Sequence, residues 1–150
     1  MLSKLQRTII ALQNNNIMSV DLAGEKIGCD GIKAIAGALI LNTSLKRLVL
    51  GGVVFGCGID EKGISVLANA LVQNRTLMEL DLRSNKINDV GAKALANKLQ
   101  EHCSLVRIDL RSNPIGDEGA KALVDLVQNR QNKLQIALDE LIHDQMRDWR

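Results

Sequence analysis

The residues that could take part in catalysis or metal binding are few and widely separated. The histidines are His102 and His143, and the cysteines are Cys29, Cys57 and Cys103. Neither set has the spacing of a zinc site, a redox pair or a nucleophile with its base. The histidines are therefore interpreted as solvated surface groups, and the thiols as buried core residues of a protein from a reducing compartment. The sequence predicts no catalytic residue, no metal and no cofactor.

A glycine-rich segment, residues 51–58, is a second place where chemistry could occur. Its sequence, GGVVFGCG, lacks the lysine and the hydroxyl group that a phosphate-binding loop offers to a nucleotide and its magnesium ion. The segment is uncharged and contains Phe55, the chain's single phenylalanine. Two interpretations stay open. Phe55 anchors a partner protein, or it covers the core locally where the turn lacks an asparagine.

Charged side chains form the remaining candidate site. If the segments that carry them are neighbouring parallel strands, about 4.8 Å apart, Arg47, Glu79 and Arg107 form a lateral row of alternating sign. Asp81 and Asp109 then sit beside two further arginines. This pattern fits a self-neutralised, solvated lattice, or a polar docking surface whose arginines offer fork-shaped donors to an acidic partner. The residues expected to contact a partner are Arg47, Val49, Phe55, Glu79, Asp81, Arg83, Arg107, Asp109 and Arg111.

An internal repeat positions these side chains. The segment LMELDLRSNKI at residues 77–87 recurs as LVRIDLRSNPI at residues 105–115, an offset of 28 residues, and GAKAL follows both copies. Similar strand patterns occur at residues 17–22 and 45–50, and Leu134, Ile136 and Leu138 suggest a terminal fifth strand. A regular period in which strand and helix patterns alternate predicts a solenoid.

Within each repeat, the residue types predict which side chains face the core and which residues form the turns. Alternation places Leu80 and Leu82 inward, as it does Leu48, Leu50, Ile108 and Leu110 in the neighbouring units. Asn85 and Asn113 follow the strands, where their amides can bond unpaired backbone groups of adjacent coils. Glycines at positions 31, 63, 91 and 119 are expected to allow tight entry into the helices.

The pattern LxxLxLxxNxIxDxGAxALAxxL, read from residues 77–99, resembles the ribonuclease-inhibitor type of leucine-rich repeat. The resemblance implies an α/β fold: a right-handed solenoid bent into a horseshoe arc, with parallel strands on the concave face and helices on the convex face. It also implies a non-catalytic protein-interaction module or scaffold subunit of an intracellular assembly. Two alternatives come from members of the class: actin or cytoskeleton binding as in tropomodulin, and GTPase activation as in the Ran activator.

The expected organisation has three parts. Residues 1–16 form an N-terminal capping helix, residues 17–138 four repeats and a terminal strand, and residues 139–150 a C-terminal capping helix. The first helix would cover the core with Leu5, Ile9 and Leu12, although its basic, acid-free sequence also fits a mitochondrial presequence. Two departures from the repeat stand out: Glu25 replaces the turn asparagine, and the second unit carries four extra residues.

Composition narrows the classes of partner. The formal charge is +2 and aromatic residues make up 1%, so the chain lacks the basic surface and stacking platforms of a nucleic-acid binder. The longest uncharged segment is too short to span a bilayer. We therefore expect another protein as the partner, no nucleic acid and no membrane. The expected location is the cytoplasm, with cytoskeletal or axonemal association, or mitochondria, as alternatives. The glycosylation-like sequences at residues 42–44 and 74–76 are interpreted as chance matches.

Overall fold

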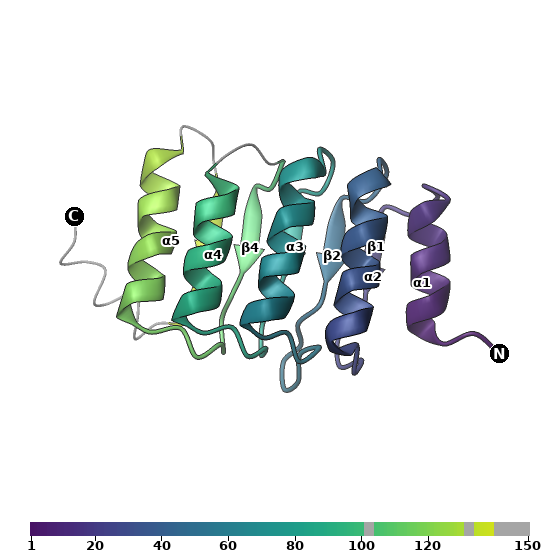
Figure 1. Ribbon diagram of the computed structural model, residues 1–150, viewed down its shortest axis with the longest axis horizontal. Helices are drawn as coiled ribbons and strands as arrows, with labels where there is room; N and C mark the ends of the chain where they lie inside the picture. Colours follow the sequence, from purple (N-terminus) through teal and green to yellow (C-terminus); the bar gives the residue numbers. More distant parts are fainter. Residues whose placement is uncertain (101–103, 131–133, 140–150) are drawn as a thin grey trace.

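The chain folds as a single row of strand–helix units (Figure 1). The structure is a computed structural model that describes residues 1–100, 104–130 and 134–139. A 5-stranded parallel sheet has its strands in sequence order, and the helices pack side by side along one face of it. The predicted α/β solenoid is confirmed. Its elements are α1 (Lys4–Gln13), β1 (Ser19–Asp21), α2 (Gly28–Leu41), β2 (Arg47–Val49), α3 (Glu61–Gln73), β3 (Glu79–Asp81), α4 (Asp89–Leu99), β4 (Arg107–Asp109), α5 (Asp117–Asn129) and β5 (Gln135–Ala137).

Strand register places equivalent residues of successive repeats side by side. Leu48, Leu80 and Ile108 form one row, which faces the helices and is buried. The inward residues that follow these strands, Leu50, Leu82 and Leu110, are buried as well, as the alternation predicts. The core is aliphatic and continuous along the solenoid. Each repeat therefore closes the apolar face of its neighbour, since a single unit could not bury its own.

The predicted asparagine ladder is present where the strands end. Asn85 Nδ2 donates to the carbonyl oxygens of Leu50 (3.0 Å) and Leu82 (2.9 Å), and its Oδ1 accepts from the Ile59 amide. Asn113 makes the equivalent bonds one repeat later. The ladder satisfies buried backbone groups that a turn would otherwise leave unpaired.

Cys57 continues the ladder in the second unit. Its amide donates to the Leu50 carbonyl, and its thiol donates to the Leu22 carbonyl at 3.2 Å. Burial, together with the charge of Glu25, raises the pKa of the Cys57 thiol to about 12, so it remains a protonated donor at neutral pH. The prediction of a buried thiol holds for Cys57 but is wrong for Cys29, which is exposed. Cys103 lies outside the described residues.

A second asparagine ladder, absent from the sequence prediction, follows the helices. Asn42 Nδ2 donates to the Leu12 carbonyl, and Asn74 Nδ2 donates to the Leu39 carbonyl, both at 2.7 Å. Each side-chain oxygen accepts the amide of the residue three positions later. Their exposed fractions are 3% and 2%, so both amides are covered by the fold. The glycosylation-like sequences are thus corner motifs, in which Ser44 adds a bond to the Ile17 carbonyl.

The repeated glycines have a different role from the predicted one. Helices α3, α4 and α5 begin two residues before Gly63, Gly91 and Gly119, so these glycines lie inside the first turn. Asp60 and Asn88 cap α3 and α4 through side-chain bonds to the amides there. A Cβ atom at position 91 would lie 2.9 Å from Ile64 Cγ2 on the preceding helix. Gly91 and Gly119 are therefore required for close packing between helices, not for a special backbone conformation. At Gly63 the nearest atom to an added Cβ would be Ile59 Cγ2, in the same repeat, at 3.1 Å.

Helix α1 covers the N-terminal end of the helix row. Ser3 and Gln6 form a capping box at its start. Leu12 is fully buried and Leu5 packs against the core, whereas Ile10 is exposed. None of the described helices is long and apolar enough to cross a membrane. The predicted C-terminal helix, apart from its first position, Asp139, lies outside the described residues.

Deleting residues 1–13 should lower the melting temperature by about 5–10 °C, since it uncovers the apolar face of α2 and removes the Leu12 carbonyl that accepts from Asn42 Nδ2 at 2.7 Å. Thermal unfolding followed by circular dichroism measures the change. An unchanged melt, together with import of the full chain into isolated mitochondria, would favour a presequence instead.

Candidate protein-binding surface on the sheet

The charged residues of the strands surround a shallow hollow on the sheet face that the helices leave uncovered. Its volume is about 230 Å³. The hollow includes every residue predicted to contact a partner except Val49 and Phe55. Its lining consists of Arg47, Glu79, Leu80, Asp81, Arg83, Arg107, Asp109 and Arg111. We call this surface the arginine hollow.

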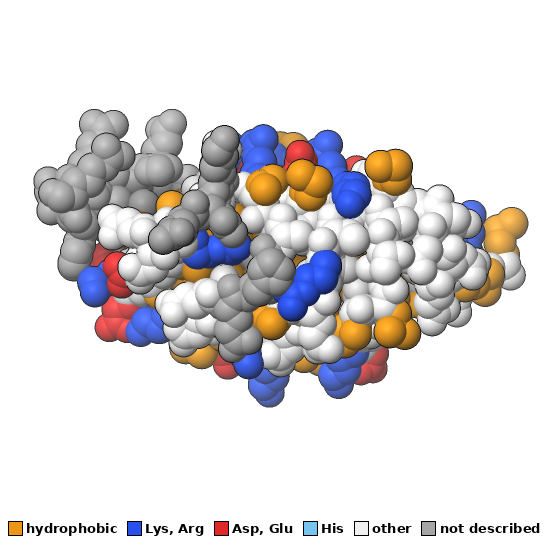
Figure 2. Space-filling view, turned by 90° about the horizontal axis from the view of Figure 1, so that it is seen from above, with side chains coloured by type: hydrophobic (Ala, Val, Ile, Leu, Met, Phe, Trp, Pro, Cys, Tyr) orange, Lys and Arg blue, Asp and Glu red, His pale blue; other side chains and the backbone are white. Residues whose placement is uncertain are grey.

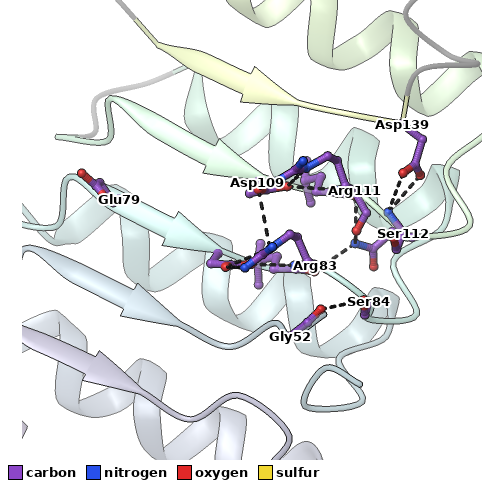
Figure 3. A network of polar contacts seen from close by, with 12 residues as sticks. Gly52, Glu79, Arg83, Ser84, Asp109, Arg111, Ser112 and Asp139 are labelled. Carbon is purple, nitrogen blue, oxygen red and sulfur yellow. Dashed lines mark hydrogen bonds and ion pairs between the residues drawn. The ribbon is translucent and has the colours of Figure 1, made fainter. Parts of the chain in front are cut away.

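Asp109 lies at the centre of an ion-pair network in the arginine hollow (Figure 3). Its side chain is 9% exposed. Arg111 donates to it from Nη2 at 2.6 Å and from Nε at 3.0 Å, while Arg83 Nε lies 3.6 Å from Asp109 Oδ2. Arg83 also pairs with Asp81 at 2.7 Å. The two arginines therefore hold the buried carboxylate of Asp109 and the partly buried carboxylate of Asp81 in place, and reversing their charge would disturb the fold as well as any binding.

The aspartates also shape the chain after each strand. Asp81 Oδ1 accepts the Arg83 amide at 3.0 Å, and Asp109 Oδ1 accepts the Arg111 amide at 3.2 Å. The next residues, Ser84 and Ser112, have positive φ angles of 56° and 58°. The sequence prediction missed these serines, although the repeated triplet Arg-Ser-Asn is a visible signal of a shared turn.

Two opposing effects act on the pKa of Asp109. Burial raises it, but the hydrogen bonds and charge of Arg111, together with the charge of Arg83, outweigh burial and lower the pKa below 3.8. A carboxyl group with a lowered pKa in the folded state stabilises the protein most at a pH above its unfolded pKa. That contribution is lost as the pH falls through the lower, folded value.

Asp109→Asn should lower the free energy of unfolding by about 1–3 kcal/mol at pH 7, because charge-assisted hydrogen bonds are lost. The difference from the wild type should stay constant down to about pH 4 and shrink below it, where the wild-type carboxyl group also becomes protonated. Urea unfolding at several pH values measures both quantities. A difference that grows on acidification would contradict this account of the ion pair.

The row of alternating charge is only partly paired. Arg47 Nε lies 3.7 Å from Glu79 Oε2, and both side chains are well exposed. Arg107 lies in register between Glu79 and Gln135 and is exposed. Within the described part of the chain Arg107 makes no ion pair. The row is therefore not self-neutralised at this position.

Val49 and Phe55 do not join the arginine hollow. Val49 is 7% exposed and lies in register between Asp21 and Asp81 on the flanking strands, so its small side chain is covered and is removed from the predicted surface. Phe55 is 73% exposed, so the interpretation that it covers the core is wrong. Cys57 closes that turn instead.

No group of three or more metal-binding side chains occurs among the described residues.

Known proteins resemble the chain in sequence and in fold. The family model described as leucine-rich repeat matches residues 73–96 and 101–124. The pig (Sus scrofa) ribonuclease inhibitor is 35% identical over 83 residues, which are 55% of this chain and 17% of that protein. Leucine-rich repeat-containing protein 45 of Gallus gallus is 35% identical over 75 residues, or 50% of this chain and 11% of that protein. The chain thus matches less than a fifth of the length of either relative.

Solved structures resemble the chain over almost its whole length. Leiomodin-1 actin-binding site 2 aligns with a TM-score of 0.79 and 17% identity, covering 99% of this chain and 93% of that one. The Caenorhabditis elegans tropomodulin C-terminal domain aligns with a TM-score of 0.76 and 12% identity, covering 97% and 92%. Solved structures this distant in sequence show the shared fold. The strand–helix repeat, its asparagine ladder and the sequence similarities identify the chain as a leucine-rich-repeat protein of the ribonuclease-inhibitor type.

Proposed function

We propose that the chain is a non-catalytic protein-interaction module that binds an acidic protein surface in the arginine hollow. One observation carries this proposal: Arg107 is an exposed cation in the hollow and makes no ion pair with any of the described residues. Solenoids of stacked repeats offer extended surfaces of this kind to other proteins.

The exposure of the charges in the hollow supports an acidic partner. The side chains of Asp81 and Asp109 are 13% and 9% exposed, whereas those of Arg83 and Arg111 are 31% and 46% exposed. The carboxylates of Asp81 and Asp109 are thus less exposed than the guanidinium groups that pair with them. Apart from Glu79, the well-exposed charged groups of the hollow are arginines. A planar guanidinium group binds a carboxylate through two parallel hydrogen bonds, which gives geometric specificity as well as attraction.

Arg107→Glu tests the proposal, because among the described residues the Arg107 side chain makes no ion pair and supports no buried carboxylate. The main partner is first identified by affinity capture and mass spectrometry, and its affinity is then measured with purified components. We expect binding to weaken by about tenfold or more. Stability should fall by no more than about 1 kcal/mol, because the new like-charge pair with Glu79 is exposed. Arg7→Glu on α1 makes the same change in net charge far from the hollow and should bind normally. Equal binding by wild type and Arg107→Glu would place the site elsewhere.

Actin is a second candidate partner. Two solved structures with the same fold are the leiomodin-1 actin-binding site 2 and a tropomodulin C-terminal domain, and each aligns over more than nine tenths of this chain. Under this candidate the chain works in association with the cytoskeleton. Cosedimentation with purified actin filaments and a pointed-end assembly assay test it directly. Failure to bind filaments or monomers, or to alter pointed-end growth, would remove actin as the partner.

A further inference from the structure

The segment between β2 and Cys57 projects from the edge of the solenoid where strands end and helices begin. In Figure 1 it is the blue-green loop below α2 and α3. At its tip, Val53, Val54 and Phe55 are 88%, 70% and 73% exposed. We call residues 51–56 the apolar finger. The opposite edge, seen from above in Figure 2, carries scattered apolar side chains among polar ones.

The base of the finger is held firmly against the next repeat. The Gly56 amide donates to the Ser84 carbonyl at 2.9 Å, and the Ser84 hydroxyl donates to the Gly52 carbonyl at 2.8 Å, a bond that Figure 3 shows. A Cβ atom at position 51 would lie 2.2 Å from the Arg83 amide nitrogen. One at position 56 would lie 2.6 Å from the Ser84 carbonyl oxygen. The glycines thus let the base fit closely while the tip stays in solvent.

The repeat itself does not require the finger. Cys57 closes the turn and continues the ladder, and the third and fourth repeats make the same turn with four fewer residues. Three adjacent apolar side chains in water stabilise nothing within the chain. An apolar group on a well-fixed base is, however, favourable for binding, because little conformational freedom remains to be lost.

We infer that the apolar finger inserts into an apolar pocket of the partner, beside acidic side chains that meet the arginine hollow. This inference rests on the proposed function. The finger and the hollow are contiguous, since the Gly52 amide donates to the Arg83 carbonyl at 3.3 Å and Arg83 lines the hollow. One partner surface can therefore reach both, with carboxylates over the guanidinium groups and an apolar pocket over Phe55.

A protein fits the finger better than an anionic lipid surface does. The edge that carries the finger also carries the first turns of the helices. Those of α4 and α5 hold Asp89, Asp117 and Glu118, of which Glu118 is paired with Lys93, and in the first turn of α3 Lys62 follows Glu61. These carboxylates would oppose the approach of a negatively charged bilayer. They do not oppose a pocket that encloses only the tip.

Site-specific photocrosslinking of the full chain tests the inference. A photoreactive phenylalanine analogue replaces Phe55. In a control protein it replaces Leu41, which is 78% exposed and lies at the C-terminal end of α2, on the edge of the solenoid opposite the finger. After irradiation in cells that express the chain, mass spectrometry maps the crosslinked residue on the partner. We expect position 55, but not position 41, to crosslink within an apolar pocket flanked by Asp or Glu.

Affinity measurements with that partner complete the test. Phe55→Ser should weaken binding by about tenfold or more with an unchanged melting temperature, and Phe55→Leu should retain most of the affinity. If Arg107→Glu weakens binding while Phe55→Ser does not, the finger has no role and the proposed function stands. If neither variant weakens binding, both proposals are wrong. Crosslinks from position 55 to lipid or to a second copy of this chain would also overturn the inference.

Discussion

Leu82→Ala is expected to lower the free energy of unfolding by about 2–5 kcal/mol. Leu82 follows β3, is fully buried, and lies between Leu50 and Leu110, the equivalent buried residues of the flanking repeats. Truncation leaves a cavity at the middle of the row, where it weakens the packing on both sides. In a solenoid, where stability is the sum of repeat and interface contributions, a central defect affects two interfaces at once.

Chemical denaturation followed by circular dichroism measures this loss. Leu41→Ala is the matched control, because that leucine is 78% exposed and its truncation should change stability by no more than about 0.5 kcal/mol. A small loss for Leu82→Ala, similar to the control, would show that the core tolerates a cavity at its centre. That result would contradict the close packing between repeats.

Gly119→Ala is expected to destabilise the protein by about 1–3 kcal/mol even though alanine favours a helix. The added Cβ would lie 2.5 Å from Asp89 Oδ1 and 3.0 Å from the Asp89 Cα on the preceding helix. That carboxylate oxygen cannot move freely, because it accepts the amides of Gly116 at 2.7 Å and Gly119 at 2.9 Å. The substitution therefore either separates α4 from α5 or breaks the bonds that cap α5.

Gly37→Ala provides a control with the opposite expected sign. Gly37 is exposed within α2, and an added Cβ would have no atom within 4 Å. Alanine should stabilise the helix there by about 0.5–1 kcal/mol. Thermal melts of the two variants separate the effects of helix propensity and helix packing. If both substitutions were stabilising, the glycine at position 119 would not be required by packing.

The repeat, the strands and the inward leucines could be predicted from the sequence because they depend on local periodicity. Alternation within a strand determines which side chains share a face, and an offset of 28 residues aligns one unit with the next. The row of Arg47, Glu79 and Arg107 follows from these two facts alone, and the observed register agrees with it. The ladder roles of Asn85 and Asn113 were equally accessible.

The packing of helices and loops against neighbouring units was decided only by the tertiary structure. A periodic pattern states which way a side chain points, but not what the next helix or loop places against it. For this reason the packing role of Gly91 and Gly119, the corner bonds of Asn42 and Asn74, and the burial of Val49 escaped prediction. The ladder role of Cys57, unlike its burial, escaped prediction for a related reason. Because four extra residues precede Cys57, it does not align with Asn85 in the sequence. The equivalence of the two residues follows only from the ladder bonds that Cys57 makes in the folded chain.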